Sequence, residues 1–212
     1  MSLSERFICL SKSEIVPGRP FTDPERNADD LATLEYIAKR LRYVLSQAEA
    51  IRLYPSPLLL YLPEPGGLRL RITITNPDEL RQSTDLTVVG FCGQKRPDVD
   101  RSQLDGVDLE LVSEFLEHPH LLSYNSLELK EGNWCNLVLF SHPQGIMHWA
   151  HSIKHAHAAS QLAPQYYLAI RLHNGLLPGG LMSDNNLTLT STKYYDYKDQ
   201  VTWQAVRELQ CA

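Results

Sequence analysis

The sequence predicts an α+β protein in which residues 85–174 form one β-α-β-β-α-β unit. Short runs rich in apolar and β-branched residues occur at 86–92, 121–129, 134–140 and 166–172. Apolar residues at helical spacing separate the first run from the second and the third from the fourth, whereas a tight turn separates the second from the third. The predicted order is therefore strand, helix, hairpin, helix, strand.

A long amphipathic helix is predicted ahead of this unit. Thr22 stands three residues before Glu25, a capping-box pattern that is typical of a helix start. Apolar residues then recur at helical spacing on one stripe, which comprises Leu31, Leu34, Ile37, Ala38, Leu41, Val44, Leu45 and Ala48. Residues 58–62 and 68–75 follow as a β-hairpin, because apolar and polar residues alternate along the second of them.

The other elements follow from the same patterns. Residues 107–116 carry apolar side chains at helical spacing, and residues 143–162 form a second helix between two prolines. After the unit, residues 187–197 alternate enough to be a late strand. Residues 201–209 are expected to form a short helix.

Composition excludes several classes of partner. The chain has 20 Lys and Arg against 25 Asp and Glu, a formal net charge of −5, and no concentrated basic face. We therefore expect no nucleic-acid partner. No uninterrupted apolar run approaches the ~18 residues of a membrane span, so we expect no membrane partner and a cytoplasmic location.

Motifs for common cofactors and nucleophiles are missing. The sequence contains no Walker loop, no G-x-G-x-x-G turn and no G-x-S-x-G elbow, which argues against an NTPase, a dinucleotide-binding enzyme or a hydrolase. The four cysteines, Cys9, Cys92, Cys135 and Cys211, are widely spaced and are expected to be reduced and mostly buried.

Histidines are concentrated in one part of the chain. Seven of the eight lie between positions 118 and 157, namely His118, His120, His142, His148, His151, His155 and His157. At about 100° per residue, His148, His151 and His155 fall within an arc of roughly 60° on the second helix. His157 falls on the opposite, apolar side, together with Trp149.

Two interpretations of the triplet stay open. His148, His151 and His155 have the i, i+3 and i+4 spacings that allow two imidazoles to reach one divalent metal ion. Because no H-E-x-x-H carboxylate or nearby Cys or Asp accompanies them, a solvated polar face is the simpler interpretation.

On its element order and on the His- and Trp-bearing second helix, the stretch 85–174 resembles the dimeric α+β-barrel superfamily. This superfamily includes antibiotic-biosynthesis-type monooxygenases, dye-decolourising peroxidases, chlorite dismutases and haem-degrading enzymes. The resemblance implies a homodimer and a ferredoxin-like sheet with its helices on one face. Residues 85–212 would then be this unit with a C-terminal extension. Residues 1–84 would be an N-terminal segment of the same domain or a divergent first half of a tandem.

The resemblance also suggests a cofactor site. In the resembling haem proteins the iron-binding His lies on a helix above the sheet, so His157 is a candidate haem ligand, with Trp149 lining the pocket. A buried His with satisfied ring nitrogens is the structural alternative. Arg171 and His173 share one strand face and are candidates for recognising an anion, or are the polar face of an edge strand.

Three functions are compatible with these observations. The first is binding of a small organic ligand, including haem, in a pocket between sheet and helices, with oxygenase-like chemistry as one form of it. The second is a non-catalytic dimerisation or interaction module. The third is divalent metal binding by the histidine triplet. The sequence does not decide whether the protein is an enzyme, and it assigns no catalytic residue.

Overall fold

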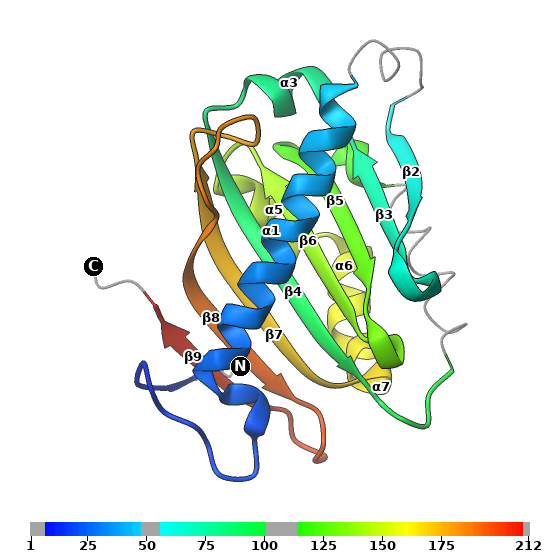
Figure 1. Cartoon of the computed structure of the whole chain (residues 1–212). Helices are drawn as coiled ribbons and strands as arrows, with labels where there is room; N and C mark the ends of the chain where they lie inside the picture. Colours follow the sequence, from blue (N-terminus) through cyan, green and yellow to red (C-terminus); the bar gives the residue numbers. More distant parts are fainter. Residues whose placement is uncertain (1–6, 48–55, 101–113, 210–212) are drawn as a thin grey trace.

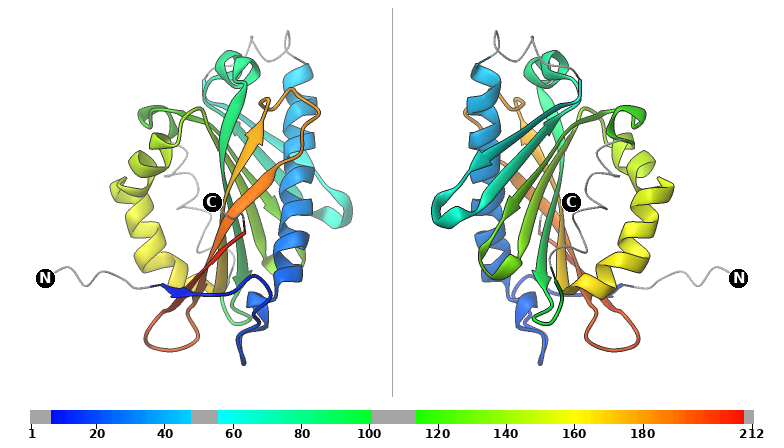
Figure 2. Two further views of the ribbon diagram at one scale, coloured as in Figure 1. Left: turned by 90° about the vertical axis from the view of Figure 1, so that its left-hand side faces the viewer. Right: turned by 90° about the vertical axis from the view of Figure 1, so that its right-hand side faces the viewer.

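The computed structural model describes residues 7–47, 56–100 and 114–209. Its centre is a single nine-stranded sheet (Figures 1 and 2). Helix α1 covers one face of the sheet, called the first face below, and helices α5 to α7 cover the other, called the second face. The strands are β1 (Ile8–Cys9), β2 (Leu58–Pro63), β3 (Arg69–Ile74), β4 (Asp85–Lys95), β5 (Leu121–Glu128), β6 (Trp134–Phe140), β7 (Tyr167–Pro178), β8 (Thr188–Asp196) and β9 (Trp203–Glu208). Their order is β1-β9-β8-β7-β4-β6-β5-β3-β2. Only the β1–β9 pair is parallel among these neighbours.

The α+β character is confirmed, but the prediction of a ferredoxin-like fold with helices on one face is wrong. The strands β7, β4, β6 and β5 are neighbours in that order, yet they are only the middle of a much larger sheet. Strands β3 and β2 extend it on one side, and β8, β9 and β1 extend it on the other. Residues before 85 therefore share this sheet. Their long helix covers its first face, which the predicted ferredoxin-like fold, with helices on one face alone, would leave uncovered.

Helix α1 (Pro24–Ser46) crosses the first face of the sheet diagonally (Figure 1). The side chain of Asp23, rather than Thr22, caps it by accepting a hydrogen bond from the Glu25 backbone N–H at 2.9 Å. The predicted apolar stripe is confirmed from Leu34 to Leu45, because Leu34, Ile37, Ala38, Leu41, Val44 and Leu45 are all buried in the core. Leu31 is partly buried, and Ala48 lies outside the described residues. Complete burial of one such side chain contributes roughly 1.5–3 kcal/mol.

One glycine allows α1 to approach the sheet closely. A Cβ atom at Gly90 of β4 would lie 2.5 Å from Leu34 Cδ1, closer than carbon atoms can pack. The absence of a side chain at this position therefore sets the distance between α1 and β4.

The helix predicted for residues 143–162 is broken. The structure has α5 (Gln144–Ala150), α6 (Ile153–His157), a π-helical turn (Ala158–Leu162) and α7 (Ala163–Tyr166). The break lies at Ser152, whose side chain accepts a hydrogen bond from the His155 backbone N–H at 3.2 Å and so starts a new helix. Because the break changes the helical phase, the predicted orientations of later side chains do not hold.

Other predicted elements also differ. Residues 203–208 form strand β9 and not a helix, since they pair with both β8 and β1. The predicted helix at 107–116 lies mostly outside the described residues, which begin again at 114 and include a 3-10 turn (Phe115–Glu117). A short helix, α3 (Pro77–Gln82), was not predicted.

The expectation of reduced cysteines is wrong for one pair. Cys92 of β4 and Cys135 of β6 are direct cross-strand neighbours, with Cα atoms 4.3 Å apart, and they form a disulfide. Cys9 is a free, exposed thiol, and Cys211 lies outside the described residues. No helix in the described ranges is long and apolar enough to cross a membrane.

Candidate functional site

The histidines of the segment predicted as one helix, residues 143–162, point in different directions. His148, His151 and His157 are exposed, whereas His155 is half-buried, with its ring against that of Trp149. The expected common face of His148, His151 and His155 is therefore not formed. His157 does not face the sheet, and this position supplies no buried imidazole for a haem iron. The residues present do not fit a haem at this helix.

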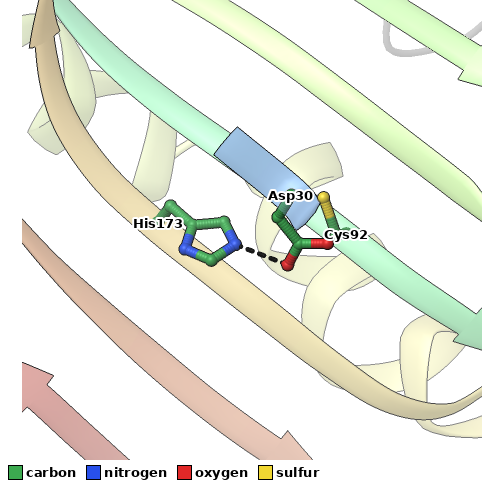
Figure 3. A group of neighbouring side chains, drawn as sticks. All are labelled: Asp30, Cys92 and His173. Atoms are coloured by element: carbon green, nitrogen blue, oxygen red, sulfur yellow. Dashed lines mark hydrogen bonds and ion pairs between the residues drawn. The ribbon is translucent and has the colours of Figure 1, made fainter. Parts of the chain in front are cut away.

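Arg171 and His173 share one face of β7, as predicted, and both reach towards α1. The anion that they contact is the carboxylate of Asp30 on α1. Arg171 donates to Asp30 from Nε at 2.5 Å and from Nη2 at 2.8 Å, and His173 Nε2 donates to Asp30 Oδ2 at 2.9 Å. Figure 3 shows the imidazole directed at this carboxylate.

The second ring nitrogen of His173 is also occupied. Its Nδ1 lies 2.9 Å from the hydroxyl of Thr192 on β8, and both side chains are completely buried. The Thr192 hydroxyl can donate to this nitrogen or accept from it. We name Asp30, Cys92, Arg171, His173 and Thr192 the Asp30 cluster.

Burial and hydrogen bonding act in opposite directions on Asp30. Burial by itself raises the pKa of a carboxyl group, but the hydrogen bonds from Arg171 and His173 outweigh it, so the pKa of Asp30 lies below its ordinary value. The carboxylate is therefore ionised at neutral pH and fixes α1 to β7 electrostatically.

The Asp30 cluster also contains metal-ligating atom types. Ligand atoms of Asp30, Cys92 and His173 all lie within 4.8 Å of one another, and no other such group of three occurs among the described residues. In Figure 3 the sulfur of Cys92 lies beside the carboxylate. Sequence reasoning missed Asp30, although Asn27, Asp30 and Leu34 have the spacing of one helix face and all three are buried.

Trp149 belongs to a different cluster, on the second face of the sheet. It is buried, and its ring lies between those of His118 and His155, with centroids 4.8 and 4.9 Å away. Beneath it is Tyr124 of β5, with ring centroids 6.0 Å apart. The Tyr124 hydroxyl accepts a hydrogen bond from Asn136 Nδ2 at 3.0 Å.

Thr73 of β3 is the register partner of Tyr124, so both side chains lie on this second face. We name Thr73, His118, Tyr124, Asn136, Trp149 and His155 the Tyr124 cluster. Phe115 stacks on the Tyr124 ring at 4.9 Å, and the Arg71 guanidinium lies 5.7 Å from its centroid.

Four polar atoms of the Tyr124 cluster are buried without a hydrogen-bond partner in the part of the chain that the structure describes. They are Thr73 Oγ1, His118 Nε2, Asn136 Oδ1 and His155 Nδ1. Glu114 Oε2 lies 3.9 Å from His118 Nε2, which is too long for a hydrogen bond. Burial, with a smaller effect of His118, lowers the pKa of His155 to about 4, so His155 is neutral at pH 7.

A shallow cleft of about 210 Å³ lies between α1 and residues 184–187. Its lining includes charges of both signs, from Glu35, Lys39 and Asp184. Within the described ranges, none of its lining side chains has a buried polar atom without a partner. The cleft therefore lacks the unmet hydrogen bonding of the Tyr124 cluster.

The fold and these two clusters define an α+β protein whose single sheet is enclosed between helices. The chain matches no family model, no curated protein and no solved structure. The resemblance to the dimeric α+β-barrel superfamily stays a prediction.

Proposed function

We propose that this chain binds a small organic ligand at the Tyr124 cluster, between strands β3, β5 and β6 and helices α5 and α6. The observation that carries this proposal is the set of four buried polar atoms without partners. Native proteins satisfy nearly all such atoms, and each exception costs roughly 1–3 kcal/mol. A bound molecule that supplies the missing hydrogen bonds would recover this free energy.

The surrounding side chains indicate the chemistry of the ligand. The rings of Phe115, Tyr124 and Trp149 offer apolar and aromatic surface to a flat molecule. Asn136 Oδ1 can only accept, so the ligand must carry at least one hydrogen-bond donor. Neutral His155 and the Thr73 hydroxyl can each donate or accept. We therefore propose a small planar molecule with both donors and acceptors, and we do not propose haem.

The proposal is tested by removing one of the unpartnered polar atoms while the volume of its side chain stays nearly the same. Thr73→Val replaces a buried hydroxyl with a methyl group. A ligand that co-purifies with the wild-type protein is detected by native mass spectrometry and by chromatography of the small molecules released on denaturation. A panel of planar heterocycles is then screened for binding by thermal shift. Wild type should retain or bind a ligand that raises its melting temperature, and Thr73→Val should lose this effect.

Two matched controls locate the site. Thr33→Val removes a hydroxyl from the outer side of α1, and Lys39→Ala alters the cleft beside α1. Both should keep the ligand. The proposal fails if Thr73→Val binds ligand as well as wild type does, or if Lys39→Ala loses it. A ligand-free protein that no compound stabilises would instead support the non-catalytic interaction module.

The homodimer that the resemblance implies is a separate proposal. Tyr61 on the edge strand β2 is 55% exposed, which gives this edge an apolar contact surface. Light scattering coupled to size-exclusion chromatography should give twice the chain mass, and Tyr61→Lys should shift the protein towards monomer. A wild-type monomer at micromolar concentration would contradict it.

A further inference from the structure

We infer that Asp30, Cys92 and His173, together with Cys135, bind one zinc ion when the Cys92–Cys135 disulfide is reduced. This site lies on the first face of the sheet, under α1, and is independent of the ligand site proposed for the second face. It comprises one residue from each of α1, β4, β6 and β7, and Figure 3 shows three of them, Asp30, Cys92 and His173.

The ligand atoms are already close to the required geometry. In a tetrahedral zinc site, N, O and S ligands lie roughly 3.3–3.7 Å from one another. His173 Nε2 and Asp30 Oδ2 are 2.9 Å apart, and no pair among Asp30, Cys92 and His173 exceeds 4.8 Å. A zinc ion therefore needs shifts of about 1 Å or less among these three ligands. Cys135 is not part of this group of three, but it is bonded to Cys92, so after reduction its sulfur has to move towards Asp30 and His173 to become the fourth ligand.

The residues around the ligands have the arrangement that supports metal binding. A metal-binding histidine normally donates its second ring N–H to a neighbouring oxygen, and a ligating carboxylate is itself hydrogen-bonded. Thr192 Oγ1 lies 2.9 Å from His173 Nδ1, and a hydroxyl can accept as readily as it donates. His173 can therefore change tautomer and free Nε2 for the metal. Arg171 already holds the carboxylate of Asp30.

Charge balance explains why the site depends on reduction. In the disulfide form, Asp30 and Arg171 neutralise each other, so a divalent cation would bring two uncompensated charges into a buried position. Two thiolates compensate for Zn²⁺ completely. The zinc form and the disulfide form thus bury the same net charge.

The chemical steps balance with a dithiol as the reductant. The dithiol supplies two electrons and two protons, breaks the S–S bond and becomes a disulfide itself. Cys92 and Cys135 are then thiols, and they release two protons to solvent when Zn²⁺ binds. Both sulfurs are buried, so reduction requires α1 to open, or zinc is taken up before the disulfide forms. The redox state would then decide whether α1 is held by the Asp30–Arg171 ion pair alone or by this ion pair and a metal ion.

The test compares reduced and oxidised full-length protein. The protein is purified with a non-chelating phosphine, or oxidised, and then mixed with Zn²⁺ or Co²⁺. Reduced wild type should bind one zinc per chain by native mass spectrometry, and its cobalt form should show the near-ultraviolet thiolate-to-metal band. Oxidised protein should bind neither ion at this site.

Variants distinguish zinc bound at this site from zinc bound by other Cys and His side chains of the protein. Cys92→Ser should abolish binding, whereas Cys9→Ser, which changes an exposed thiol, and His148→Ala/His151→Ala should leave it unchanged. Thr192→Val, which removes the positioning hydroxyl, should weaken zinc affinity about 10- to 100-fold while leaving the thiolate band in place.

Three outcomes would overturn the inference. They are reduced wild type without bound zinc, a cobalt form without a thiolate band, and loss of zinc in the His148→Ala/His151→Ala variant. Because the cobalt spectrum is recorded on wild type, the inference can be rejected even if Cys92→Ser does not fold.

Discussion

His173 Nε2 donates a hydrogen bond to Asp30 Oδ2 at 2.9 Å, although 143 residues separate the two in sequence. With Arg171, this contact joins helix α1 to the interior strand β7 through an ion pair that is largely shielded from water. Such a pair costs desolvation free energy when it forms, but losing one partner costs more.

Replacement of this carboxylate should be strongly destabilising. Asp30→Asn leaves the Arg171 guanidinium partly buried without a counter-charge, and we expect the free energy of unfolding to fall by about 3–5 kcal/mol. Urea denaturation followed by far-ultraviolet circular dichroism measures this loss. Asp29→Asn removes a neighbouring, exposed carboxylate that pairs with Arg26, and it should cost less than about 0.5 kcal/mol. Equal losses in the two variants would contradict the role of the Asp30 cluster.

The same carboxylate should make stability depend on acid pH. The pKa of Asp30 is lower in the folded protein than its ordinary value of 3.8, so its stabilisation is complete above this value. It is lost as the pH falls through the lowered folded pKa, because the carboxylate must then be protonated. The difference between wild type and Asp30→Asn should therefore shrink below about pH 4. A difference that stays constant down to pH 2 would contradict this.

His155 should produce a second pH dependence, at higher pH. Burial lowers its folded pKa to about 4 from 6.5, so between these values the unfolded chain binds more protons than the folded one. Stability should consequently fall as the pH is lowered from 6.5 to about 4. His155→Gln should flatten this part of the melting-temperature profile, whereas His151→Gln, at an exposed position, should not. An unchanged slope in His155→Gln would show that other groups cause it.

The close packing of α1 on β4 can be tested by adding a side-chain atom at the point of contact. Gly90→Ala places a methyl group 2.5 Å from Leu34 Cδ1, and we expect a loss of about 1–3 kcal/mol. Leu34→Ala alone should cost about 2–5 kcal/mol. The double variant should lose less than the sum, since the shortened side chain makes room for the added methyl group. Strict additivity in urea denaturation would refute the contact.

Ser152 should stabilise the break between α5 and α6. Its hydroxyl oxygen accepts a hydrogen bond from the His155 backbone N–H, and its O–H donates to Glu114 Oε2 at 2.8 Å. Ser152→Ala should lower the free energy of unfolding by about 0.5–2 kcal/mol. Ser160→Ala, at an exposed position, should change it by less than about 0.5 kcal/mol. If Ser152→Ala is as stable as wild type, the break has another cause.

Local sequence patterns predicted many elements because local forces determine them. The stripe from Leu34 to Leu45 and the alternation in residues 68–75 each describe how one segment buries its own apolar side. They do not describe what lies on the other side of the sheet. The one-sided, ferredoxin-like fold was therefore wrong, even though most of its strands and its preceding helix were found.

The candidate sites were less accessible to prediction. Arg171 and His173 were correctly placed on one strand face, but their partner Asp30 is distant in sequence and lies on another element. His157 was misplaced because a helical projection assumes an unbroken helix, and Ser152 interrupts it. Thr73 and Asn136 carried no signal, since each is an ordinary polar residue of a strand.

The sequence by itself determined where α1 and most of the strands form, because periodicity and proline positions act over a few residues. Only the tertiary structure decided the order of the nine strands, the pairing of Cys92 with Cys135 and the burial of Asp30 against His173. These features depend on contacts between segments many residues apart. Their free energy exists only once both segments are packed together, so no local pattern records it.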